Sequence, residues 1–400
     1  MLFKKKRIYL DYASATPVSR EATREMKKIE EIYGNPGALH AEGVRAKTQL
    51  SMSRALVARA LSCTASEIIF TSGGTESNNL AILGVAQHIL RTGQDITQTH
   101  WIVGSIEHDS ILSTMGEVER LGGIVTYLEP NNEGIYETEA LTQVLRPQTV
   151  FVSLGWANSE IGVVQPLSKL SRAIRTHEVA HGSRVLLHTD AGQATLYEKT
   201  TVHTLGVDLL SLDSGKLYGP RGIGALYVKR GVELSSILFG GKQERGLRPG
   251  TENVVLATGC AAALIKVART RATEHARLEK MRAELFTVLQ HHIPTLILNT
   301  PLEHSLPHML NISIPSIDTE YFVLSLDSAG IAVSTKSACR EGEEAQSHVV
   351  YALGPTGGYT AEVRSAHTIR LSLGQETTMK DIVRAGKEIV HIYARIRSMV

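Results

Sequence analysis

The sequence contains few cysteines, few aromatic residues and no long hydrophobic run. Its three cysteines, Cys63, Cys260 and Cys339, are odd in number and widely spaced, with no Cys-x-x-Cys pair. This pattern argues against a disulfide framework or a structural zinc site and favours a reducing, cytoplasmic setting. No segment reaches the roughly 20 apolar residues that a membrane-spanning helix needs. We therefore expect no membrane partner.

The sequence also lacks a strong excess of charge of either sign. A formal net charge of +2 gives no reason to expect direct binding to nucleic acid. The basic cluster at residues 4–7 precedes an apolar run that is too short for a signal peptide, so we expect a solvated leader. A globular composition over 400 residues exceeds the usual size of one domain and predicts two packed domains.

Short β-rich runs alternate with helical patterns between about residues 66 and 230. Helices are expected in the intervening stretches, such as 76–90 and 109–121. This alternation predicts an α/β fold with a mostly parallel sheet covered by helices on both faces. Ligands of such sheets bind at the carboxyl ends of the strands. The buried strands are expected at residues 68–71, 101–103, 124–128, 150–154 and 185–187.

A different pattern follows toward the C-terminus. A long charged helix is expected at about residues 261–292, and shorter α+β elements and a final helix from about residue 378 come after it. We expect a smaller α+β domain that the N-terminal segment joins. The predicted division is a large domain at residues 20–258 and a small one made of residues 1–19 and 259–400.

Lys216 and Asp190 form the first candidate pair of functional residues. Lys216 follows a short apolar run and precedes the glycine-rich stretch 218–224, while Asp190 ends an apolar strand. A lysine held by such a turn can be desolvated, which lowers its pKa and makes its amine nucleophilic. Pyridoxal 5'-phosphate (PLP) needs an amine for a Schiff base and a carboxylate that keeps its ring nitrogen protonated. Lysines near Gly-Pro turns are usually solvated, so this pair depends on other converging features.

Two further stretches lie where such a cofactor would bind. Residues 71–79 connect a strand to a helix, and their glycines, backbone N–H groups and Thr75 hydroxyl suit an anion at a helix N-terminus. An ordinary capped turn explains the same stretch equally well. His108 follows the next strand and starts a helix, where an imidazole can stack on a ring or carry protons. A surface or capping role is the alternative for His108.

Cys339 is the candidate nucleophile of the C-terminal part. It lies between Lys336 and Arg340, whose charges favour the thiolate, and directly precedes a polar, flexible segment. Cys63 and Cys260 lie in helical, alanine-rich surroundings and are expected to be packing residues.

Taken together, these motifs resemble the cysteine desulfurases of the NifS/IscS type, which are class-V aminotransferase relatives with the PLP-dependent fold type I. The resemblance runs nearly end to end and includes the spacing from Cys339 to residues 352–354, which matches the long mobile loop of this group. The motifs that carry it are residues 9–17, 33–36, 71–77, 158–162, 190–193, 216–220, 243–253, 337–339 and 368–374.

The resemblance implies a role for each matching residue around PLP. Lys216 would form the Schiff base, Asp190 would pair with the ring nitrogen, and His108 would stack on the ring and assist proton transfer. Gln193 would contact the phenolic oxygen. The phosphate would be bound by Gly74 and Thr75, and by Thr251 of a neighbouring subunit, which implies a homodimer.

The resemblance also implies the substrate and the reaction. Asn35 and Arg370 would hold the carboxylate of L-cysteine, a task that suits the planar fork of arginine. Cys339 would attack the substrate sulfur, leaving an enzyme persulfide and releasing L-alanine. Sulfur acceptors in iron–sulfur cluster assembly or tRNA thiolation would be the partners. A selenocysteine lyase, another PLP lyase and a degenerate non-catalytic paralogue are the alternatives.

Several residues depart from the family pattern near the cofactor. Asp213 replaces a phosphate-binding hydroxyl residue, and a carboxylate there is unfavourable beside a phosphate. We expect Ser214 to supply a hydroxyl instead, or a cation to compensate the charge. The other departures are Ser159 in place of an asparagine, Gly215 in place of a histidine, and Lys242 and Lys336 in place of glycines.

Overall fold

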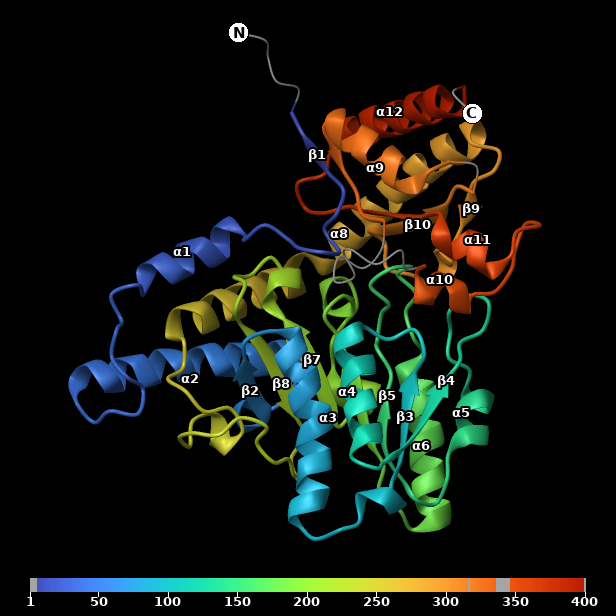
Figure 1. Cartoon of the computed structure of the whole chain (residues 1–400). Helices are drawn as coiled ribbons and strands as arrows, with labels where there is room; N and C mark the ends of the chain where they lie inside the picture. Colours follow the sequence, from blue (N-terminus) through green and yellow to red (C-terminus); the bar gives the residue numbers. More distant parts are fainter. Residues whose placement is uncertain (1–5, 316, 336–345, 399–400) are drawn as a thin grey trace.

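The computed structural model describes residues 6–315, 317–335 and 346–398 and contains a large lower sheet region and a smaller upper region (Figure 1). The expectations for Lys336, Cys339 and Arg340 lie outside the described residues. Within the described ranges no helix combines the length and the apolar character needed to cross a membrane.

The large region is built on a seven-stranded sheet. Strand β8 runs antiparallel to both of its neighbours, and the other strands are parallel to one another. The prediction of a mostly parallel sheet is therefore confirmed. The strand order is β2 (Ile68–Thr71), β8 (Gly224–Val228), β7 (Leu209–Asp213), β6 (Leu186–Asp190), β5 (Thr149–Ser153), β3 (His100–Gly104) and β4 (Ile124–Leu128).

Helices cover both faces of this sheet because successive strand residues point to opposite sides. Ile69, Val103 and Leu226 pack with α3 (Gly74–Arg91) and α4 (Asp109–Arg120) in one buried cluster. The opposite face, which includes Phe70 and Val152, packs in a second cluster. That second cluster also continues into the smaller region. Its helices beside the large sheet include α2 (Ala41–Leu61), α5 (Thr138–Val144), α6 (Leu167–His181), α7 (Val202–Leu205) and α8 (Val254–His292).

The smaller region contains a three-stranded antiparallel sheet. Its central strand β10 (Met309–Ser313) pairs with β12 (Thr368–Ser372) and with β9 (Ile297–Leu298). Near the chain start, β1 (Ile8–Tyr9) pairs in parallel with β11 (Ile331–Ala332), so the N-terminal segment lies beside this region. The remaining helices are α1 (Arg20–Lys28), α9 (Thr319–Ser328), α10 (His348–Ala352), α11 (Ala361–Ala366) and α12 (Met379–Arg397).

Helix α8 connects the two regions. It packs against α1 and α2 beside the large sheet and against α12 and β10 in the smaller region. The predicted boundary between residues 258 and 259 lies inside this continuous helix. The division into two domains stays a prediction.

The antiparallel direction of β8 was not predicted. β7 and β8 pair directly, with Asp213 opposite Gly224. The connection at residues 214–223 contains only the short 3-10 turn Ser214–Lys216, and a parallel return needs a much longer crossover. The chain therefore turns back beside the strand that it has just left.

A buried ion pair fixes α2 against the edge of the large sheet. Arg54 of α2 donates to both carboxylate oxygens of Glu244, at 2.6 and 2.5 Å. Glu244 is 6% exposed and also accepts a hydrogen bond from the backbone N–H of Phe70 in β2 at 2.8 Å. The pair thus ties a helix, a loop and a strand together.

We expect Arg54→Ala to lower the free energy of unfolding by about 3 kcal/mol, because it leaves a buried carboxylate without its cation. The measurement is the urea concentration at the midpoint of unfolding, with the dependence of the unfolding free energy on urea concentration expected to stay the same. Arg120→Ala is the matched control, since Arg120 pairs with Glu117 on the exposed face of α4 and should leave the midpoint unchanged. Equal midpoints for Arg54→Ala and the wild type would contradict the role of this pair.

Candidate active site

A pocket of about 290 Å³ lies at the carboxyl ends of the parallel strands. Strands β3, β5, β6 and β7 all end at this edge, and residues at their ends or shortly after them line the pocket. The lining includes most of the predicted cofactor residues: Gly74, Thr75, His108, Ser159, Asp190, Gln193 and Lys216. Arg370 enters from β12 of the smaller region. One pocket therefore collects residues from both parts of the fold.

Asp190 is the last residue of β6, and neutral donors orient its carboxylate. Its Oδ2 accepts from Asn78 Nδ2 and its Oδ1 accepts from the Gly192 N–H, each at 2.8 Å. Asn78 lies in α3 and is 1% exposed. Each carboxylate oxygen has a second lone pair, so Asp190 can still accept a hydrogen bond from a ring nitrogen.

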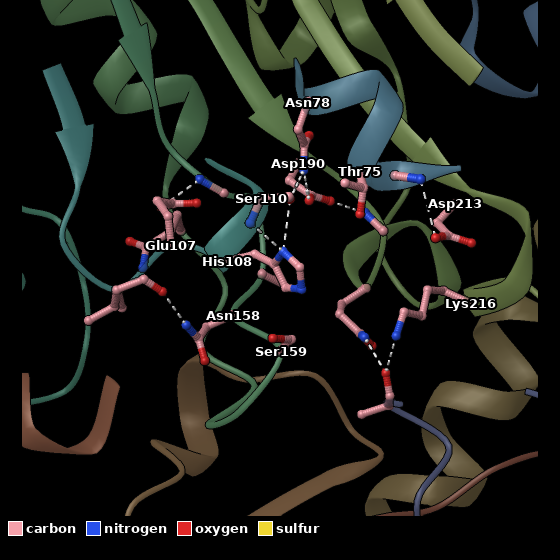
Figure 2. Close-up of a pocket in the computed structure, with 18 of the residues that line it drawn as sticks. Thr75, Asn78, Glu107, His108, Ser110, Asn158, Ser159, Asp190, Asp213 and Lys216 are labelled. Atoms are coloured by element: carbon pink, nitrogen blue, oxygen red, sulfur yellow. Dashed lines mark hydrogen bonds between the residues drawn. The ribbon is translucent and has the colours of Figure 1, made fainter. Parts of the chain in front are cut away.

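His108 is connected to Asp190 through two side chains. Asn78 Nδ2 also donates to Ser110 Oγ at 2.9 Å, and Ser110 Oγ lies 2.8 Å from His108 Nδ1. The backbone N–H of Ser110 donates to the same Nδ1 at 3.1 Å. Because a backbone N–H can only donate, this hydrogen bond places the proton of the neutral imidazole on Nε2. Figure 2 shows the His108 ring, Asp190 and Lys216 around one space.

Sequence reasoning missed Asn78 as a functional residue. Its position was nevertheless readable, since Asn78 follows Thr75 by three residues and the two therefore share one face of α3. Its side chain looks like an ordinary buried amide until the partners at Asp190 and Ser110 are known.

Glu107 forms a buried carboxyl site next to His108. Its Oε1 accepts from the Tyr136 hydroxyl at 3.1 Å and from the Gly155 N–H at 2.9 Å. Burial raises the pKa of Glu107 to about 7, although these two hydrogen bonds lower it. The absence of a side chain at Gly104 leaves space for Glu107 and Tyr136, because a Cβ there would lie 1.9 Å from the Tyr136 hydroxyl oxygen. Sequence reasoning missed Glu107 as well.

Lys216 ends the 3-10 turn that follows β7. Its Nζ donates to the backbone oxygens of Ala13, at 3.0 Å, and of Ser14. Gln193 Nε2 donates to the same Ala13 oxygen at 2.8 Å, and the buried Gln193 Oε1 has no hydrogen-bond partner among the described residues. The N-terminal segment thus reaches into the pocket and holds the lysine amine.

Asp213 lies at the end of the pocket where α3 begins. Its Oδ2 accepts from the Gly74 N–H at 3.2 Å, and its Oδ1 accepts from the Gly215 N–H at 2.7 Å. The expectation that Ser214 supplies a hydroxyl here is wrong. Ser214 is 1% exposed and does not line the pocket, and its Oγ lies so close to Gly219 that a Cβ there would come within 2.2 Å. The tight turn directs this hydroxyl into the protein interior.

Arg370 is almost fully buried, at 3% exposure. Its Nη2 donates to Asp11 Oδ1 at 2.8 Å and to the Ser14 hydroxyl, and its Nη1 donates to the Ser159 backbone oxygen at 2.9 Å. Its Nε is buried without a hydrogen-bond partner in the described part of the chain. The guanidinium is therefore held in place while its Nε–H is still available to a ligand.

The predicted pairing of Asn35 with Arg370 is not seen within one chain. Asn35 is exposed, does not line the pocket, and its Oδ1 accepts a hydrogen bond from the Gly37 N–H at 2.9 Å. Asn158 lines the pocket instead, and its Nδ2 donates to the Ile106 oxygen at 2.8 Å. The side chain of Asn35 stabilises its own turn, and this local bond could not be distinguished from a ligand contact in the sequence.

Thr251 and Lys242 also lie outside this pocket. Thr251 is exposed and lines a separate pocket beside Glu244 and Arg248. Its role toward a neighbouring subunit stays a prediction. Lys242, one of the two lysines that could compensate Asp213, is exposed and does not line the pocket, and the other, Lys336, lies outside the described residues.

The two described cysteines have the character of packing residues. Burial raises the pKa of the Cys63 thiol to about 12 and that of Cys260 to about 11. Neither thiol is therefore poised to form a thiolate at neutral pH.

Comparison with known proteins identifies the family. Residues 8–384 match the family model of the class-V aminotransferases. Cysteine desulfurase IscS of Dictyoglomus turgidum is 35% identical over 397 residues, which are 99% of this chain and 96% of that protein. This chain belongs to the cysteine desulfurase family.

Solved structures agree with this assignment to the cysteine desulfurases. A NifS-like protein aligns with a TM-score of 0.88 at 31% identity and covers 97% of this chain and all of its own. SspA in complex with cysteine aligns with a TM-score of 0.76 at 32% identity, over 92% of this chain and 98% of its own. The predicted resemblance and the aminotransferase-like fold are confirmed. Enzymes of this family depend on PLP.

The raised pKa of Glu107 predicts how stability depends on pH. Since the folded-state pKa of about 7 exceeds the ordinary value of 4.5, the folded state binds the proton more tightly. The contribution of the Glu107 proton to the free energy of unfolding is therefore complete below about pH 4.5, and it decreases as the pH rises through 7. After burial and the two hydrogen bonds, electrostatic interaction with Asp190 raises this pKa and that with His108 lowers it.

We expect Glu107→Gln to remove this decrease. Relative to wild type, the variant should gain up to about 3 kcal/mol between pH 5 and pH 8, since one pKa unit corresponds to ~1.4 kcal/mol. Urea midpoints of both proteins at the two pH values provide the measurement. A difference between the two proteins that does not change with pH would show that Glu107 has no raised pKa.

Proposed function

We propose that this protein is a PLP-dependent cysteine desulfurase that converts L-cysteine to L-alanine and transfers the sulfur to Cys339 as a persulfide. One observation carries the proposal: the pocket joins Lys216 and an oriented Asp190 carboxylate to the buried Arg370. The family relationship over 99% of the chain supports the same activity.

The pocket residues suit the ring of PLP. Buried polar atoms without a partner are rare in proteins and mark places where a ligand completes the hydrogen bonds. Asn78 Oδ1, Gln193 Oε1 and Arg370 Nε are three such atoms in the lining. Lys216 Nζ would hold the cofactor aldehyde, Asp190 its ring nitrogen and His108 its ring face. Bound PLP draws electrons from the α-carbon of an amino acid through its protonated ring.

The other predicted cofactor residues complete this assignment. Gln193 would contact the phenolic oxygen beside Ser159, while Gly74 and Thr75 would present the start of α3 to the phosphate. Thr251 of a neighbouring subunit would reach the same phosphate in a homodimer. Asp213 lies at this end too, and its charge would oppose that of the phosphate.

The chain also supplies groups for the substrate and its protons. Arg370 Nε is positioned to donate to the substrate carboxylate, because Asp11 and Ser159 already fix both Nη atoms. Lys216 Nζ is the group that would remove and return protons at the substrate carbons. His108 Nε2 carries an exchangeable proton in the same pocket, and the hydrogen bonds at Nδ1 keep it there.

The sulfur transfer would take place at Cys339. Its thiolate forms a bond to the substrate sulfur while the substrate bond between Cβ and sulfur breaks. The electron pair of that bond stays with Cβ, which takes up a proton and becomes the methyl group of alanine. The products are one alanine and one Cys339 persulfide. We propose a cytoplasmic setting in which acceptors for iron–sulfur cluster assembly or tRNA thiolation then remove the sulfur.

We expect Cys339→Ala to lower the rate of alanine formation by more than about a thousandfold, as loss of a catalytic nucleophile does. The variant should still develop the visible absorption of lysine-bound PLP. The measurement is alanine release together with mass spectrometry of the persulfide. Cys63→Ala is the matched control, because the raised pKa of Cys63 keeps it a thiol, and it should retain full activity.

Retained turnover in Cys339→Ala would exclude this nucleophile. A wild-type protein that stays colourless after incubation with PLP would instead indicate a degenerate, non-catalytic relative.

A further inference from the structure

We propose that Asp213 is a resident anion in the phosphate end of the pocket and determines how strongly this chain prefers PLP over unphosphorylated pyridoxal. The inference rests on the proposed use of PLP and concerns a residue in which this chain departs from the family pattern. It predicts that removal of the Asp213 charge strengthens the binding of the phosphate group and leaves the binding of the ring unchanged.

The Asp213 carboxylate covers the turn that would bind a phosphate. It accepts a hydrogen bond from the Gly74 N–H, the first residue of the 18-residue helix α3, at 3.2 Å. A Cβ built on Gly74 would lie 3.4 Å from Asp213 Oδ2, and one built on Gly73 would lie 3.6 Å from it. The carboxylate thus occupies the anion position at the positive end of the helix dipole.

The backbone on both sides keeps Asp213 in this place. The register of β7 and β8 pairs Asp213 with Gly224. A Cβ on Gly224 would come within 2.7 Å of the Gly73 Cα, so the strand and the turn are packed against each other. The second oxygen of Asp213 accepts from the Gly215 N–H at 2.7 Å. Asp213 can leave the turn only by rotation of its side chain.

The hydrogen bonds that hold this carboxylate come from neutral donors. Both Asp213 oxygens accept from backbone N–H groups, those of Gly74 and Gly215, which satisfy the carboxylate without removing its charge. Arg248, near the start of α3, pairs with Glu76 at 3.1 Å, and the Glu76 carboxylate also accepts from the Ser72 N–H at 2.8 Å. A phosphate entering this end would therefore meet the Asp213 carboxylate, while the Arg248 guanidinium is already engaged by Glu76.

The charge of Asp213 acts on one part of the cofactor only. Like charges within a few ångströms repel strongly in a partly buried pocket, so Asp213 opposes a bound phosphate. The residues assigned to the ring lie elsewhere in the pocket: Asp190 ends β6, Gln193 lies in the turn after β6, and His108 caps α4. Their hydrogen bonds go to groups other than Asp213. Pyridoxal, which lacks the phosphate, should therefore not respond to this residue.

The test compares dissociation constants of PLP and pyridoxal, measured by visible absorbance titration of cofactor-free protein. We expect Asp213→Ser to bind PLP at least about tenfold more tightly, a change of ~1.4 kcal/mol, with the constant for pyridoxal altered less than about twofold. Asp213→Asn keeps the shape of the side chain and loses its charge. It should therefore lower the ratio of the PLP dissociation constant to the pyridoxal dissociation constant, as Asp213→Ser does. Asp318→Asn is the matched control, since Asp318 caps α9 outside the pocket, and it should leave the ratio unchanged.

A second readout needs no cofactor. Inorganic phosphate should raise the Tm of Asp213→Ser and Asp213→Asn but not that of wild type, because only the variants have a vacant anion position. If the ratio of PLP to pyridoxal affinity is the same in wild type and both variants, Asp213 does not have this role, whereas the proposed function stands. If no variant binds either compound, the cofactor assignment fails, and this inference fails with it.

Discussion

The parallel pairing of β6 with β7 is the constraint on which the active site depends. Asp190 at the end of β6 lies beside Ser211 in this register. The next residues of β7 therefore bring Asp213 and then Lys216 to the same edge of the sheet. A shift of the β6–β7 register by one residue would turn the side chains of one strand to the opposite face of the sheet. Because apolar residues of both strands are buried, such a shift is unfavourable, and the pocket geometry is thereby fixed.

The N-terminal segment links the smaller region to the pocket. It starts as β1 in the smaller region, and its residues Ala13 and Ser14 then accept the Lys216 amine. Asp11 of the same segment binds Arg370, which comes from β12. Residues near the chain start thus position Lys216 relative to Arg370.

The sequence predicted those residues that can be recognised from their type and their position after a strand, without knowledge of their contacts in the fold. Asp190 and His108 follow apolar strands, and the ends of parallel strands meet at one edge of a sheet. Asn78 and Glu107 were missed because their function depends on partners far away in the chain, namely Asp190 for the first and Tyr136 for the second. The Ser214 prediction failed because the direction of a hydroxyl is decided by a single turn. The five strands predicted for the large sheet correspond to β2 to β6, whereas β7 and β8, with its reversed direction, were not predicted.

The central claim is that Lys216 is the residue that holds the cofactor. Its direct test is reduction of the protein with borohydride after incubation with PLP, followed by digestion and mass spectrometry of the peptides. The account predicts one phosphopyridoxyl group, attached to Nζ of Lys216. A label on a different lysine, such as the exposed Lys242, or no label at all would contradict it.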